Sequence, residues 1–181
     1  LVGAENPVAA GGARNARVSI VRCGGYGSEA RTALDRSFDL LGGIGSLVKH
    51  KTVTVKINLT GSNFQPILGR PVGESYVTHP ATVMAMTAAF FEAGARRVRL
   101  VESTQLRQPL EKTVVDAGFD LNALRALGNV EVEDTRNLGK GNGYAAFKVP
   151  GGGLLFDGFE LNHSYADTDV FVSLCKLKTH G

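Results

Sequence analysis

The sequence predicts an α/β protein: a three-layer α/β/α fold with a mainly parallel sheet and a small antiparallel ribbon in the C-terminal half. Short apolar runs at 52–58 and 170–174 alternate with stretches of helical periodicity, as in parallel sheets joined by helices. Glycine-rich turns at 139–143 and 150–153 flank an alternating stretch at 144–149, and this pattern indicates the ribbon.

The composition is that of an ordinary globular chain. Its 181 residues suffice for one domain with a core, and we divide them into a flexible arm at 1–14 and an α/β domain at 15–181. The net charge of +3 gives no argument for nucleic acid and suits a small anionic molecule. No apolar run approaches the roughly 18 residues of a transmembrane segment.

The two cysteines, Cys23 and Cys175, stand far apart without a CxxC pair. No iron–sulfur or zinc motif is encoded, and no cofactor is identified. Buried free thiols are favoured over a single disulfide between them.

The first elements are a strand at 17–23, a turn at 24–27 and a helix that begins at Ser28 and ends at Gly42. The segment Gly25-x-Gly27-x-x-Ala30 matches the loose dinucleotide fingerprint, but the next strand ends in Lys56-Ile57-Asn58, without the acidic residue that holds a ribose. A plain glycine turn is therefore the favoured interpretation.

The remaining elements follow in order. A strand at 52–58 leads into a long connection at 59–77, which is typical of a lid or binding loop. Pro80 suits the first position of a helix that ends at Gly94, which places His79 at its N-cap. Further strands are expected at 96–101 and 130–134, one or two helices at 109–127 with a break near Gly118, and a buried strand from Val170.

Polar side chains gather where these strands end. Because ligands bind beyond the carboxyl ends of parallel strands, we expect a site there. The helix N-terminus at His79, with its free N–H groups and positive dipole, favours an anion. The candidate residues are Lys56, Asn58, Thr78, His79, Glu102, Ser103, Lys176, Lys178 and His180.

Two interpretations of this edge stay open. In the first it is an enzyme site, in which Lys56, His79 and Lys176 are catalytic. In the second it is a non-catalytic module that captures a ligand or partner. In both, Asn58, Thr78, Ser103, Lys178 and His180 bind the ligand, and a metal held by His79, Glu102 and His180 is a further option.

Structural explanations compete with these roles. Lys176 and Lys178 could close a buried strand by pairing with Glu102 and aspartates, and His79 could be a simple cap. Arg96, Arg97 and Arg99 are expected to form a solvated rim at the start of their strand. His163 and Asp167 are expected to be caps or surface residues.

Five short motifs in order resemble the bacterial and archaeal DUF362 family across residues 17–180. They are Lys56-Ile57-Asn58-Leu59, Thr78-His79-Pro80, Gly94-Ala95-Arg96-Arg97-Val98, Glu102-Ser103 and Lys176-Leu177-Lys178-Thr179-His180. The family has no established function, so the resemblance implies a site and not an activity. Ile57 and Cys175 stand where members often have proline.

The resemblance carries further expectations. Many relatives have a ferredoxin-like segment with iron–sulfur cysteines, which this chain lacks. The family domain continues beyond the closing motif, so the chain is expected to be truncated at its C-terminus. Some relatives carry twin-arginine export signals, which agrees with a start rich in alanine and glycine and without Met. An exported location is therefore one expectation and a cytoplasmic one the alternative.

Overall fold

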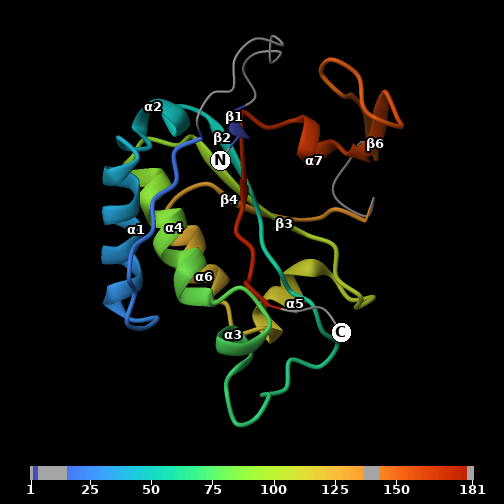
Figure 1. Ribbon diagram of the computed structural model, residues 1–181. Coiled ribbons are helices and arrows are strands. Elements are labelled where there is room, and N and C mark those ends of the chain that lie inside the picture. Colours follow the sequence, from blue (N-terminus) through green and yellow to red (C-terminus); the bar gives the residue numbers. More distant parts are fainter. Residues whose placement is uncertain (1, 4–15, 137–142, 179–181) are drawn as a thin grey trace.

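The computed structural model of the protein describes residues 2–3, 16–136 and 143–178 (Figure 1). Its main sheet has the strand order β1-β7-β2-β3-β4. Four strands run parallel: β7 (Val170–Ser173), β2 (Thr52–Lys56), β3 (Arg97–Glu102) and β4 (Val130–Asp134). The short β1 (Val2–Gly3) pairs antiparallel with β7.

A second, two-stranded antiparallel sheet joins β5 (Tyr144–Lys148) to β6 (Gly158–Asn162). We call this hairpin, residues 144–162, the ribbon. The sheets confirm the predicted α/β class, with a mainly parallel sheet and a small antiparallel ribbon in the C-terminal half. The glycine-rich loop expected at 139–143 lies largely outside the described residues.

Helices cover one face of the main sheet. Buried side chains of α4 (Pro80–Glu92), α5 (Leu110–Asp116) and α6 (Leu121–Ala126) join those of β2 and β3 in one core, as does Phe38 of α1 (Ser28–Leu40). Phe90 of α4 is fully buried. The predicted break near Gly118 separates α5 from α6, because this glycine takes φ +91°, which side-chain-bearing residues rarely adopt.

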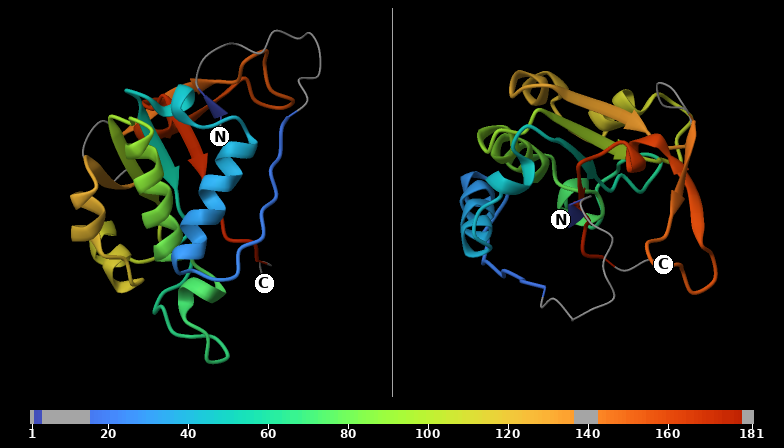
Figure 2. Two further views of the ribbon diagram at one scale, coloured as in Figure 1. Left: turned by 90° about the vertical axis from the view of Figure 1, so that its left-hand side faces the viewer. Right: turned by 90° about the horizontal axis from the view of Figure 1, so that it is seen from above.

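The opposite face carries only the one-turn helix α7 (His163–Ala166) and the ribbon, which lies on the side of the sheet away from α1 and α4 (Figure 2). α7 contacts the sheet through Thr54, whose hydroxyl donates to the Ser164 carbonyl at 3.4 Å. The two faces of the sheet are therefore covered unequally: in the described part of the chain, four helices pack on one face, and only α7 and the ribbon lie on the other. Two further one-turn helices, α2 (Gly45–Val48) and α3 (Val72–Ser75), stand in predicted connections.

Three local predictions are wrong. Residues 17–23 form no strand; they run extended beside α1, with Val18 and Ile20 81% and 91% exposed, because no described strand lies beside them (Figure 2). The glycine-rich turn expected at 150–153 extends to 157, because β6 begins only at Gly158 and the Val149 amide bonds to the Asp157 carbonyl at 2.9 Å.

The third error concerns the cysteines. Both thiols are free, as expected, but both are exposed where burial was predicted. None of the described helices is long and apolar enough to cross a membrane.

Candidate functional site

The carboxyl ends of β2, β3 and β7 meet at one edge of the sheet, beside α3 (Figure 1). Parallel pairing explains this placement, since Lys56 at the end of β2 lies level with Val101 of β3 and Ser173 of β7. The predicted site residues divide into two groups along this edge.

The first group is centred on Glu102, the last residue of β3. Its side chain is 7% exposed, and Oε1 accepts a 2.6 Å bond from the Lys56 ammonium. The same carboxylate accepts the amides of Ser103 (Oε1, 2.7 Å) and Leu59 (Oε2, 2.7 Å). Lys56 also donates to the Ile57 carbonyl at 2.7 Å. Glu102 is therefore fully engaged, and the charge of Lys56 is neutralised within the protein.

The Thr78 side chain links residues that follow β2 and β7. Its buried hydroxyl accepts the Asn58 amide and donates to the Leu174 carbonyl, both at 2.9 Å. The Asn58 side chain in turn donates to the Tyr76 carbonyl at 2.6 Å. These bonds hold the start of the 59–77 connection against the sheet, so Thr78 and Asn58 shape the edge through structural contacts.

The second group is centred on Tyr26, from the glycine turn before α1. Its ring stacks on His79 with centroids 3.8 Å apart and planes 6° apart. The Lys176 ammonium donates to the Tyr26 hydroxyl at 3.1 Å and to the Gly73 carbonyl of α3 at 2.6 Å. It also lies 5.3 Å from the centre of the Tyr26 ring, within the range of a cation–π contact. Lys176 thus joins β7, α3 and the turn before α1.

His79 is the N-cap of α4, as predicted. Its Nδ1 accepts the Ala81 amide at 3.1 Å, and its carbonyl accepts the amides of Thr82 and Val83. The first donors of the helix are therefore already satisfied, and the free N–H groups expected for an anion are not there. Because Nδ1 accepts, the proton of the neutral ring sits on Nε2.

Burial and the nearby charge of Lys176 lower the pKa of His79, while Glu74 opposes them. Both main causes disfavour the protonated ring. His79 is thus held as a neutral hydrogen-bond donor through Nε2 near neutral pH.

The side chains of Ser103 and Lys178 form no hydrogen bond or ion pair with either group among the described residues. Ser103 is exposed, Lys178 is partly buried, and His180 lies outside the described residues. Within 16–136 and 143–178, no hydrogen bond or ion pair joins Lys56 to His79 or Lys176. The same ranges contain no group of three or more His, Cys, Asp or Glu side chains that could hold a metal ion.

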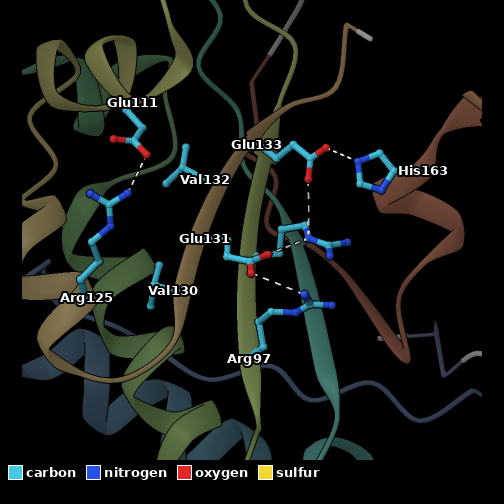
Figure 3. Close-up of a pocket in the computed structure, with 9 residues that line it drawn as sticks. Arg97, Glu111, Arg125, Val130, Glu131, Val132, Glu133 and His163 are labelled. Atoms are coloured by element: carbon cyan, nitrogen blue, oxygen red, sulfur yellow. Dashed lines mark hydrogen bonds and ion pairs between the residues drawn. The ribbon is translucent and has the colours of Figure 1, made fainter. Parts of the chain in front are cut away.

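The prediction of a solvated rim of arginines is wrong for Arg99, whose side chain is 3% exposed. It pairs with Glu131 of β4 at 3.3 Å and with Asp167 at 3.2 Å. Glu133 lies 3.7 Å from the same guanidinium and bonds to His163. Figure 3 shows Glu131, Glu133 and His163 lining a cavity of about 320 Å³ beside β4, which Glu111 of α5 and Arg125 of α6 also line.

This charged network ties β3, β4 and α7 together, because each of its carboxylates pairs with an arginine or with His163. Its signal was present in the sequence. Arg97 and Arg99 alternate along β3, and Glu131 and Glu133 along β4. Because Arg99 lies opposite Glu131, the four side chains share one face of the sheet and bring opposite charges together. Tyr26 had no comparable signal, because its position depends on how the turn before α1 meets Lys176.

Comparison with known proteins identifies a family. A family model described as a domain of unknown function (DUF362) matches residues 53–181, more than half of the chain. Neither the curated proteins nor the solved structures yield a match. The matched range contains His79, Glu102 and Lys176 and excludes Tyr26.

Proposed function

This chain belongs to the DUF362 family, and from the geometry of its sheet edge we propose that it binds a small anionic molecule there, with Lys176 as the principal cationic contact. One observation carries the proposal. In the described part of the chain, Lys176 makes no ion pair, and its ammonium rests on two neutral oxygens, the Gly73 carbonyl and the Tyr26 hydroxyl.

The contrast with Lys56 supports this choice of residue. Lys56 already has a buried carboxylate at 2.6 Å, so an anion there would have to displace Glu102. Lys176 offers a positive charge without such competition, and an anion beside it would gain a charge-assisted hydrogen bond. His79 can add a donor through Nε2. Lys178, two residues further along the chain, supplies a second charge near the same edge.

The geometry favours binding over catalysis by His79. A general base at this position would have to accept a proton on Nε2, but the cap to Ala81 places the proton of the neutral ring on that atom. Catalysis through an amine of Lys56 or Lys176 is the alternative function. It would show as turnover lost in a variant that still binds the anion.

The test is calorimetric titration with inorganic phosphate and, separately, with succinate as a dicarboxylate. Lys176→Gln should weaken binding about 10- to 100-fold, since a hydrogen bond to a charged group contributes roughly 1.5–3 kcal/mol. Lys148→Gln is the matched control, because it removes the same charge from an exposed site on the ribbon. Equal affinities in the two variants would refute the role of Lys176, and so would the absence of saturable binding of either anion.

A further inference from the structure

The ribbon carries an unusual concentration of exposed apolar side chains. Six large hydrophobic residues with 40% or more exposure lie within residues 144–159: Tyr144, Phe147, Leu154, Leu155, Phe156 and Phe159. Leu154 and Leu155, at the turn, are 105% and 87% exposed. Contiguous apolar surface of this kind marks an interaction site.

The three phenylalanines of the ribbon form one face. Phe147 and Phe159 are directly paired across the two strands, so their side chains point to the same side. Phe156 packs edge-on against Phe159, with ring centroids 6.1 Å apart and planes 66° apart. Lys148 and Glu160 have the other strand parity and lie on the opposite face, together with Tyr144. The ribbon thus has one apolar and one polar face.

The ribbon has little support of its own. Its strands pair only with each other among the described residues, and a two-stranded hairpin is marginal in water unless a face is covered. It lies away from the main helices, on the far side of the sheet (Figure 2). A cover for the apolar face would supply the missing burial.

We propose that this face is a two-fold interface between two copies of the chain, each covering the ribbon of the other. The area is sufficient. The three phenylalanines are exposed by the equivalent of about one and a half whole side chains, roughly 230–380 Å². With the two leucines, a pair of copies would bury about 1,000–1,400 Å², the lower end for specific interfaces. A dimer that dissociates on dilution is the expected result.

The charges near the face disfavour a lipid bilayer as the occupant. Insertion into a membrane surface is favoured by several cations around the apolar tip. The ribbon has Lys148 but also Asp157 and Glu160, so it carries more negative than positive charge. A self-complementary pair of identical faces needs no such excess of cations.

Sedimentation velocity across a dilution series tests the proposal. The wild-type chain should sediment as a dimer at high concentration and as a monomer at low concentration. Leu154→Asp and Leu155→Asp should raise the dimer dissociation constant at least tenfold, and neither should impair folding, because both side chains are largely exposed in the turn. Leu68→Asp is the control, since Leu68 is 98% exposed in the 59–77 connection.

Three outcomes would overturn the proposal. They are a monomer at every concentration, an equal loss of the dimer in Leu68→Asp, and sedimentation of the wild type with phosphatidylcholine vesicles that Leu154→Asp abolishes. The last would assign the face to a bilayer. Circular dichroism of each variant confirms that the fold is retained.

Discussion

Removing the carboxylate of Glu102 should destabilise the fold more than removing the lysine that it neutralises. Glu102→Ala leaves three donors without their acceptor: the Lys56 ammonium and the amides of Leu59 and Ser103. Leu59 is 1% exposed, so its amide cannot turn to water, whereas Ser103 is exposed and can.

The size of the effect follows from burial. Breaking a buried ion pair by removing one partner costs about 3–5 kcal/mol. Lys56 is 31% exposed and regains part of its hydration, so we expect about 3 kcal/mol for Glu102→Ala, the lower end of that range. Lys56→Met should cost about 1–2 kcal/mol, because Glu102 keeps both backbone donors.

Urea unfolding followed by circular dichroism measures these differences. Glu102→Gln is the intermediate case, since its carbonyl oxygen can replace one acceptor while the ammonium loses its charge partner. The expected order of destabilisation is Glu102→Ala, then Glu102→Gln, then Lys56→Met. If Lys56→Met proves as costly as Glu102→Ala, the backbone donors contribute little and the reasoning is wrong.

Three further perturbations test other contacts. Because the pKa of folded His79 lies below its ordinary value near 6.5, the unfolded chain binds the proton more readily. Stability should therefore be full above about pH 6.5 and fall as the pH drops toward the lowered pKa. His79→Asn should flatten this dependence in thermal melts at several pH values. Gly73→Ala should cost about 1–3 kcal/mol of unfolding free energy, because the new Cβ would lie 2.8 Å from the His79 ring. Gly45→Ala, with nothing within 4 Å, should cost less than half as much in the same urea titration. Arg99→Met should lower the free energy of unfolding by about 3–5 kcal/mol, and a change below 1 kcal/mol would contradict a buried structural network.

Local sequence patterns predicted the elements that depend on burial. Val53 and Val55 of β2 alternate with Ile57, which directly follows the strand, and all three are buried; Pro80 begins α4 as its position suggested. The strand expected at 17–23 failed for a physical reason. Apolar and polar residues do alternate there, but a strand also needs a partner strand to pair with. Periodicity along the sequence does not show whether such a partner is present.

The sequence indicated which strand ends share one edge of the sheet, but not which side chains make contact there. Parallel topology brings Lys56 and Glu102 to one edge, which the order of strand ends indicated. The sequence did not predict which lysine pairs with Glu102. In the structure it is Lys56 and not Lys176. That choice depends on side-chain reach across the sheet, which spacing along a strand does not specify.

The position of β7 has a consequence for how the chain folds. β2, β3 and β4 follow one another in sequence and pair as neighbours, so their sheet can form through fairly local crossovers. β7 must then add beside β2, where Val53 lies opposite Val170 across more than a hundred residues of chain. Such distant contacts form late because closing a long loop is entropically costly. Substitutions in β7 should therefore speed unfolding and leave the refolding rate nearly unchanged, and the basic edge that begins with Lys176 should be the last part of the molecule to assemble.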